Sequence, residues 1–153
     1  EQTTLRLALN LSSKDLTNEA YSTFLKRLVG GKNIVLEIQY EKSTSLELLR
    51  NAIEEFKKLG LIIALDNVDN TELIDAFADG LIDIVKVRGD LIRNLSLDAS
   101  ALFTCKAIVA LCKQKKIQTV ATQLNAQTIL EAAQELEFDL FQGYIFEQPH
   151  TLT

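Results

Sequence analysis

A chain of 153 residues, 47% hydrophobic and 24% charged, is long enough to fold as one globular domain and is neither disordered nor fibrous in composition. Its formal net charge of −5 at pH 7 argues against a nucleic-acid partner, because phosphate binding needs a basic patch and the chain has only short basic clusters. No apolar run is long enough to cross a bilayer, so we expect no membrane contact by this segment.

Apolar runs alternate with amphipathic stretches along the whole chain. The runs predict strands at residues 5–11, 34–38, 61–69, 82–88, 117–122 and 140–146. Helices are predicted between them, from Asp15 or Thr17 to 29, from Ser45 to 59, from Thr71 to 78, from Ser100 to 115, and from Asn125 or Gln127 to 136. We expect Gly30 with Gly31 to end the first helix and Gly60 to end the second.

Six strand-helix units, recurring about every 20 to 35 residues, predict an α/β fold with a parallel sheet. An open doubly wound sheet and a closed barrel both fit this pattern. No glycine-rich phosphate loop of standard spacing occurs, which disfavours a nucleotide-binding doubly wound sheet. Periodicity alone does not separate the two.

The two cysteines, Cys105 and Cys112, stand in a helical stretch. Seven residues of helix separate them by roughly 10 Å, which excludes a disulfide between them. Two core thiols are typical of a reducing compartment, so the cytoplasm is the expected location. The chain contains no methionine, even at position 1, and we interpret it as a piece of a longer protein. A membrane anchor elsewhere in that protein stays open.

Polar side chains end the predicted strands: Asn10, Glu37, Asp66 with Asn67, Lys86 with Arg88, Thr122 with Gln123 and Asn125, and Gln142. In a barrel they would converge on the carboxyl-end face, where such folds place their sites. Carboxylates and amide oxygens are ligands for a magnesium-like ion, and a lysine can orient water or neutralise phosphate. Structural roles are the alternative. Glu37 can pair with Lys86 or Arg88, Asn10 can cap a turn, and Gln142 can bond to a neighbouring backbone.

Five short motifs follow one another in the chain: Asn-Leu-Ser at 10–12, Leu-Glu-Ile at 36–38, Ala-Leu-Asp at 64–66, Val-Lys-Val at 85–87, and Gln-Gly-Tyr-Ile-Phe at 142–146 with Pro149 after it. Together they resemble the EAL domain of cyclic di-GMP phosphodiesterases. The resemblance implies a TIM-type (β/α) barrel in which about six of the family's eight units are present. Residues 1–153 are then a single EAL-like domain, truncated at its amino end and lacking the Glu-Ala-Leu segment.

The same resemblance assigns roles to five residues. Asn10, Glu37 and Asp66 match metal-ligand positions, Lys86 matches the catalytic lysine, and Gln142 matches the site glutamine. The chain also departs from the family: Asn67 replaces the second Asp of Asp-Asp, 68–70 replace Phe-Gly-Thr, Arg88 replaces the Asp of Lys-Ile-Asp, and 122–125 replace Glu-Gly-Val-Glu. A two-metal site needs more negative charge than remains, so we expect the metal and catalytic residues to be vestigial.

The leading hypothesis is therefore a catalytically inactive EAL-like regulatory or protein-interaction module in bacterial cyclic di-GMP-type signalling, requiring no cofactor. Cyclic di-GMP is a candidate ligand, with Arg88 and Gln142 as its contacts. The alternative is a residual cyclic di-GMP phosphodiesterase that depends on Mg or Mn. Six units leave two strand edges exposed, and we expect a protein partner or self-association there.

Overall fold

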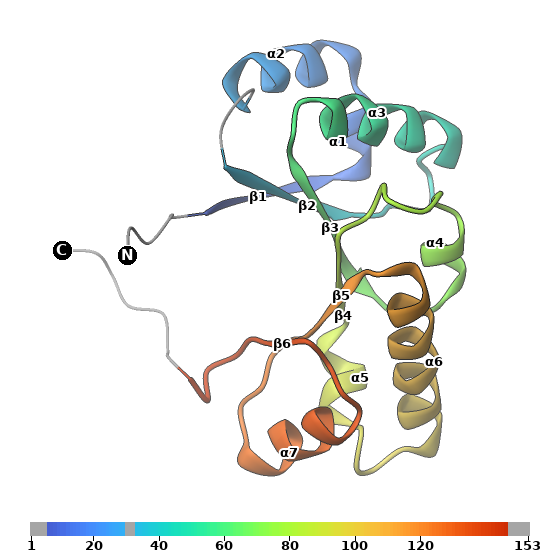
Figure 1. The fold of residues 1–153 in the computed structure, drawn as a ribbon, viewed down its shortest axis with the longest axis vertical. Coiled ribbons are helices and arrows are strands. Elements are labelled where there is room, and N and C mark those ends of the chain that lie inside the picture. Colours follow the sequence, from blue (N-terminus) through green and yellow to red (C-terminus); the bar gives the residue numbers. More distant parts are fainter. Residues whose placement is uncertain (1–5, 30–32, 147–153) are drawn as a thin grey trace, which may run out of the picture. The chain divides into compact units, whose positions relative to one another are not determined.

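The computed structural model describes residues 6–29 and 33–146, in which strands and helices alternate as the sequence predicts (Figure 1). The strands are β1 (Leu7–Ser12), β2 (Ile34–Gln39), β3 (Ile62–Val68), β4 (Ile84–Val87), β5 (Gln118–Ala121) and β6 (Leu140–Phe141). The helices are α1 (Ser13–Thr17), α2 (Glu19–Val29), α3 (Leu46–Lys58), α4 (Glu72–Asp75), α5 (Gly89–Arg93), α6 (Ala99–Lys115) and α7 (Gln127–Glu135).

The chain divides into two compact units. The first comprises residues 1–66 and 76–84, and the second comprises residues 67–75 and 85–153. The hydrogen-bonded strand order follows the chain from β1 to β6. Strands β3 and β4 run through both units. Their backbones are joined within the first unit by the bond from Asp83 N to Ile63 O, and within the second by the bond from Arg88 N to Val68 O.

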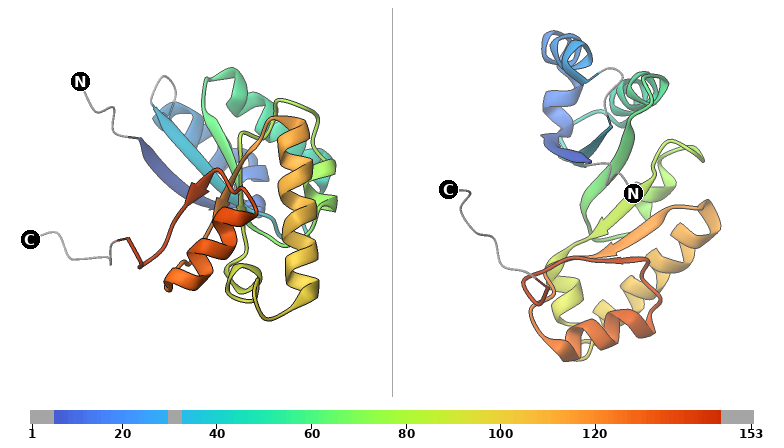
Figure 2. Two further views of the ribbon diagram at one scale, coloured as in Figure 1. Left: turned by 60° about the horizontal axis from the view of Figure 1, so that its bottom comes forward. Right: turned by 60° about the vertical axis from the view of Figure 1, so that its left-hand side comes forward.

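In the first unit, β1 pairs in parallel with β2, and β2 pairs in parallel with β3. Side chains alternate between the two faces of these strands. Leu36, Ile38, Ile63 and Leu65 form one buried face, and α3 buries Leu49, Ile53 and Phe56 along a single stripe. Figure 1 and both views of Figure 2 show α2 and α3 on the same side of these strands. The opposite face of the strands carries the buried apolar side chains of Val35 and Ala64 together with the polar side chains of Asn10, Glu37 and Asp66.

Helix α3 begins and ends as predicted. The hydroxyl of Ser45 accepts a hydrogen bond from Leu48 N, and Gly60 follows the last turn with a φ of 84° that suits glycine. At the beginning of β3, Asp83 accepts hydrogen bonds from Ile63 N and from Lys57 Nζ, each at 2.8 Å. This carboxylate ties the beginning of β3 to the segment that leads into β4.

The single helix predicted from Asp15 or Thr17 to residue 29 is wrong, because the structure has two helices there. Ser12 begins α1, its hydroxyl accepting from Asp15 N at 3.0 Å. Asn18 has an extended backbone that breaks the helix, and its side chain accepts from Tyr21 N at 3.0 Å to begin α2. Short polar side chains compete well with helical bonds, so both breaks have a local cause. The expected stop at Gly30 and Gly31 lies outside the described residues.

The second unit departs from prediction in three elements. Helix α4 covers only four residues and is capped by Asn70, whose side chain accepts from Leu73 N at 3.2 Å, rather than by Thr71. Helix α5 was not predicted at all. Strand β6 contains two residues instead of seven, because the backbone after Phe141 turns to bond with Leu124 through Gln142 O and Ile145 N.

Both cysteines are buried in α6 and free, which confirms the prediction of two core thiols without a disulfide. Burial raises the pKa of Cys105 to about 11 and that of Cys112 to about 12. Within the part of the chain that the structure describes, no helix has the length and apolar character needed to span a membrane.

Candidate functional site

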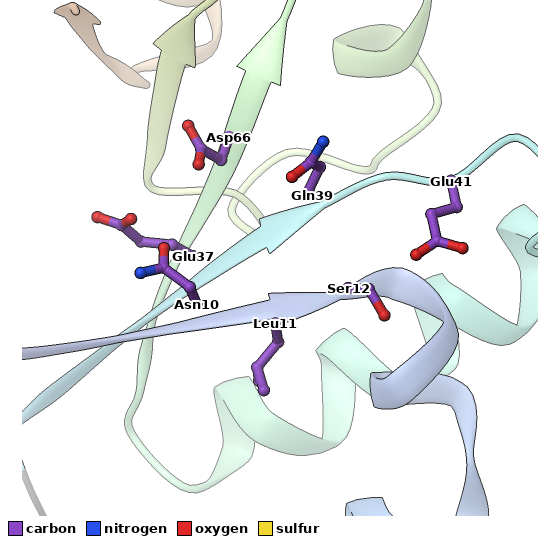
Figure 3. A pocket seen from close by; sticks show the side chains of 7 residues that line it. All are labelled: Asn10, Leu11, Ser12, Glu37, Gln39, Glu41 and Asp66. Carbon is purple, nitrogen blue, oxygen red and sulfur yellow. The ribbon is translucent and has the colours of Figure 1, made fainter.

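A pocket of about 370 Å³ opens at the carboxyl ends of β1, β2 and β3, entirely within the first unit (Figure 3). Its lining residues are Asn10, Leu11, Ser12, Glu37, Gln39, Glu41 and Asp66. Three of them carry carboxylates and none carries a positive charge. The pocket is thus rich in oxygen ligands and electrostatically suited to a cation.

The strand register explains why three of the predicted site residues meet in this pocket. Asn10 lies directly opposite Glu37, and Glu37 lies opposite Ala64, two residues before Asp66. Side chains two apart share a face, so all three project from the same side of the sheet. Figure 3 shows Asn10 and Glu37 side by side, with Asp66 on the next strand. The structure brings the predicted metal-ligand residues together, and their role as ligands stays a prediction.

The other end of the pocket was missed by sequence reasoning. Ser12 and Glu41 lie there, away from the Asn10 and Glu37 side chains (Figure 3). The buried hydroxyl of Ser13 accepts from Glu41 N at 2.8 Å and bonds to Thr44 Oγ1 at the same distance. A hydroxyl at the start of α1 therefore fixes the loop after β2, a contact that no local sequence pattern reveals.

The ligand chemistry of the pocket fits one hard divalent cation. Glu37 and Asp66 supply carboxylate oxygens and Asn10 supplies an amide oxygen, the donors that Mg²⁺ and Mn²⁺ prefer. Among residues 6–29 and 33–146, no three His, Cys, Asp or Glu side chains are grouped so that they could hold a metal ion. The amide is therefore needed as the third protein ligand, and a second ion would find few anions.

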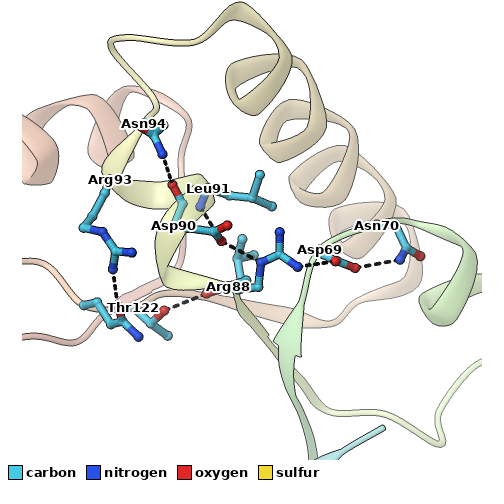
Figure 4. Close-up of polar contacts among 10 residues, drawn as sticks. Asp69, Asn70, Arg88, Asp90, Leu91, Arg93, Asn94 and Thr122 are labelled. Atoms are coloured by element: carbon cyan, nitrogen blue, oxygen red, sulfur yellow. Dashed lines mark hydrogen bonds and ion pairs between the residues drawn. The ribbon is translucent and has the colours of Figure 1, made fainter. Parts of the chain in front are cut away.

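The remaining predicted site residues, Lys86, Arg88 and Gln142, belong to the second unit. Lys86 is buried in β4. Arg88 follows β4, and its guanidinium forms ion pairs with Asp69 and, through Nε at 2.6 Å, with Asp90 (Figure 4). The hydrogen bond between Arg88 and Asp90 lowers the pKa of Asp90 and raises the pKa of Arg88.

The two partners of Arg88 were not anticipated. Asp90 is two residues away and could be found from a local pattern. Asp69 is nineteen residues earlier in the chain, so only the pairing of β3 with β4 brings it near. One alternative prediction was an ion pair between Arg88 and Glu37. The guanidinium of Arg88 does not need Glu37 as a counter-ion, because Asp69 and Asp90 already pair with it.

Gly143 of the Gln-Gly-Tyr-Ile-Phe motif lies so close to the backbone of Leu124 that a side chain does not fit there. A Cβ on Gly143 would lie 2.2 Å from both the nitrogen and the oxygen of Leu124. The neighbouring hydrogen bonds, from Leu124 N to Gln142 O and from Ile145 N to Leu124 O, hold this approach in place. Gln142 is thereby anchored by its main chain while its side chain stays exposed.

Thr122 occupies one of the positions at which the family resemblance leads one to expect a glutamate. Its hydroxyl donates a hydrogen bond to Val87 O at 2.6 Å, next to Lys86 in β4. The residue thus serves the backbone of a neighbouring strand and supplies no anion.

Comparison with known proteins identifies the family. The model of the EAL domain matches residues 1–149. The chain is 25% identical over 152 residues to the cyclic di-GMP phosphodiesterase PdeA of Borreliella burgdorferi, covering 95% of this chain and 23% of PdeA. It is 30% identical over 108 residues to the cyclic di-GMP phosphodiesterase PdeB of Shewanella oneidensis, covering 70% of this chain and 12% of PdeB. The chain thus spans less than a quarter of the length of these relatives.

Solved structures give the same answer for the fold. An EAL domain protein from Listeria monocytogenes EGD-e matches with a TM-score of 0.78 and 25% identity, over 95% of this chain and 60% of that one. Klebsiella pneumoniae BlrP1, in a complex with calcium and cyclic di-GMP, matches with a TM-score of 0.82 and 22% identity, over 96% of this chain and 39% of that one. The predicted fold class, a TIM-type barrel fold of which six strand-helix units are present, is confirmed. The chain therefore belongs to the EAL domain family.

Proposed function

We propose that this chain is an EAL module that does not hydrolyse cyclic di-GMP and that acts in bacterial cyclic di-GMP-type signalling as a regulatory or protein-interaction domain. The two compact units are parts of one domain in this proposal, which the continuous family match over residues 1–149 supports. The observation that carries the proposal is the small number of acids available as metal ligands: Glu37 and Asp66 share one part of the pocket with the amide of Asn10, and among the described residues no three His, Cys, Asp or Glu side chains are grouped to hold a metal ion.

Asn10, Glu37 and Asp66 are the residues that would hold an Mg²⁺ or Mn²⁺ ion. A bound ion of this kind polarises a phosphoryl oxygen and lowers the pKa of water. Hydrolysis by a pair of ions requires further anions to hold the second one. In this chain Asn67 and Arg88 stand where the family pattern has aspartates. The negative charge that would hold a second ion is therefore missing at these two positions.

The structure gives further support from the second unit. Arg88 is neutralised by Asp69 and Asp90, so those carboxylates are engaged with a side chain of the protein. The hydroxyl of Thr122 is directed to a backbone carbonyl. Neither replacement restores an anionic metal ligand, and both instead contribute contacts within the second unit.

Cyclic di-GMP is the candidate small-molecule ligand of the module, since it is bound in the structure of BlrP1. Arg88 and Gln142 are the proposed contacts. A phosphate can reach the Arg88 guanidinium only in competition with two carboxylates that already bind it. We therefore expect weak nucleotide binding, in the high micromolar range or weaker.

Incubation of the chain with cyclic di-GMP and Mg²⁺ or Mn²⁺, followed by chromatography of the nucleotides, tests the proposal. We expect no linear dinucleotide, under conditions in which an active EAL phosphodiesterase gives complete conversion. The matched variant is Glu37→Gln, which keeps the size of the side chain and removes one ligand charge. Linear product from the parent chain that disappears in this variant would overturn the proposal and establish the alternative, a residual metal-dependent phosphodiesterase.

Calorimetry separates the ligand from the chemistry. Cyclic di-GMP is titrated to millimolar concentration into the parent chain and into Arg88→Ala. Heat of binding that is lost in the variant supports nucleotide sensing through Arg88. Absence of both heat and thermal shift in the parent chain removes the nucleotide from the proposal and leaves protein interaction as its content.

A further inference from the structure

Gln123 has a backbone conformation that residues of its type rarely adopt. Its φ of 57° lies in the left-handed region, which is costly for a residue with a Cβ. Other non-glycine residues with a positive φ in the described part have local reasons for it: Lys116 and Glu137 stand at the ends of α6 and α7, and Asn67 is of a type that tolerates the conformation. Gln123 follows β5 and ends no helix, at a position where the family pattern has glycine. Strain of this kind is a reason to look for a function.

The side chain of Gln123 lies against helix α5. Nη1 of Arg93, the last residue of this helix, donates a hydrogen bond to Gln123 Oε1 (Figure 4). Gly89 is the first residue of the same helix, and a Cβ added there would overlap the carboxamide of Gln123. The glycine at position 89 and the left-handed backbone at position 123 together allow the amide to reach the guanidinium.

The positive charge of Arg93 is not neutralised by a carboxylate in the part of the chain that the structure describes. No ion pair joins Arg93 to an acid there, and its side chain is exposed and bonds to a neutral amide. Arg88 differs, because Asp69 and Asp90 both pair with it. An anion that binds Arg93 therefore has no carboxylate to displace.

The hydrogen bond between the two side chains also determines which groups they offer to a ligand. A guanidinium carries only donors, so the amide must turn its oxygen towards Arg93. The N–H groups of Gln123 Nε2 are not used by this bond, and neither are the other N–H groups of the guanidinium. Both side chains thus present donors, one of them cationic. A phosphate oxygen, which is an anionic acceptor, matches such a pair.

We propose that Arg93 and Gln123 form a phosphate-binding site, with the guanidinium and Gln123 Nε2 as its donors. As a site for cyclic di-GMP it rests on the proposed function, in which that nucleotide is the candidate ligand of the module. The bond between the two side chains restricts the rotamers of Arg93 before the ligand arrives, which reduces the entropy that binding costs. Arg93, rather than Arg88, then provides the larger part of the affinity for the phosphate.

Calorimetric titration of cyclic di-GMP into the chain, up to millimolar concentration and in EDTA so that no hydrolysis contributes heat, tests the site. Arg93→Ala is expected to weaken binding by about 10-fold, the loss typical of one hydrogen bond to a charged group. The matched control is Arg27→Ala, at an exposed arginine of α2 in the first unit. It removes the same charge outside the site and is expected to change the affinity by less than about twofold.

Two variants test the role of Gln123 and leave Arg93 in place. Gln123→Gly removes the carboxamide, and Gly89→Ala places a Cβ where the carboxamide lies. Each is expected to weaken binding by about 3- to 10-fold. Neither should lower the midpoint of urea unfolding, because glycine relieves the strain at position 123 and alanine favours the helix at position 89. A purely structural role of Gln123 does not produce weaker binding at undiminished stability.

Several results would overturn the phosphate site. These are a parent chain that gives no heat, an affinity retained within about twofold in Arg93→Ala, and equal losses in Arg93→Ala and Arg27→Ala. Unchanged affinity in both Gln123→Gly and Gly89→Ala would remove Gln123 from it. Binding that is lost in Arg88→Ala and kept in Arg93→Ala would overturn the site and leave the proposed function intact. Linear product from the parent chain, scored by chromatography with Mg²⁺ or Mn²⁺, would instead refute the proposed function and leave the phosphate site standing.

Discussion

Replacing Gly143 by alanine tests the structural meaning of the most specific sequence motif. The added Cβ would lie 2.2 Å from the Leu124 nitrogen and oxygen, well inside any allowed contact distance. Backbone atoms cannot rotate away as a flexible side chain can. The hydrogen bonds from Leu124 N to Gln142 O and from Ile145 N to Leu124 O hold the two segments together. Relief requires that at least one of these bonds be stretched or broken. We expect a loss of about 2–3 kcal/mol, the sum of overpacking and one weakened bond.

The matched control for this variant is Gly80→Ala. Gly80 has a φ of +87°, and a Cβ built there meets nothing within 4 Å. Its replacement therefore costs only backbone strain, about 1 kcal/mol. Urea unfolding followed by circular dichroism measures the free-energy loss of both variants. In a separate thermal melt, Gly143→Ala is expected to lower the melting temperature by about 4–12 °C. If Gly143→Ala were no less stable than Gly80→Ala, the close approach to Leu124 would not be the reason for the glycine.

Three further outcomes follow from contacts in the two units. Asp83→Ala is expected to cost about 1–2 kcal/mol in urea unfolding, because Ile63 N loses its acceptor, whereas Asp83→Asn, which keeps an acceptor, should cost less; equal losses would contradict this account. The hydrogen bond with Arg88 lowers the pKa of Asp90 in the folded state. The pair therefore stabilises the fold at pH values above the unfolded carboxyl pKa of about 4. This stabilisation is lost as the pH falls through the lower pKa of Asp90 in the folded state. Because both side chains are part-exposed, Asp90→Asn should remove less than about 1 kcal/mol at pH 7 and flatten the acid limb of the stability curve, and an unchanged acid limb would count against the pair. Burial raises the pKa values of the two cysteines to about 11 and 12, so at pH 8 native thiols should react with Ellman's reagent more than about 100-fold slower than unfolded ones; rapid native reaction would refute their burial.

Much of the fold was predictable because its signals are local. Helix α3 has a serine cap, an apolar stripe and a terminal glycine, and each of these acts within a few residues. The errors fall where tertiary contacts override local pattern. The apolar run after Leu140 has strand character, yet the approach of Leu124 turns the chain after two residues. Helix α5, five residues long, is too short to show a periodic pattern.

In the candidate site, too, the residues that follow a local pattern could be predicted and those that depend on tertiary contacts could not. Asn10, Glu37 and Asp66 could be grouped in advance, since parallel strands with side chains alternating between faces deliver equivalent positions to one edge. The environment of Arg88 could not, because its partner Asp69 becomes a neighbour only through the pairing of β3 and β4. The sequence indicates a cation in place of an acid at position 88. The structure adds that two carboxylates of the same unit already compensate that cation.

Asp83 of the first unit has a counterpart in the second unit, Asp139. Both aspartates serve the fold and neither lines the pocket. Asp139 accepts hydrogen bonds from the nitrogen and the hydroxyl of Thr119, just as Asp83 accepts from Ile63 N. Each aspartate stands immediately before a strand and clamps the starting end of the strand before it in the sheet. The pocket residues lie at or just after the finishing ends of β1, β2 and β3. A lineage of such domains can therefore exchange acids for amides or cations at the finishing ends, and so give up or alter catalysis, while the clamps at the starting ends preserve the architecture for other uses.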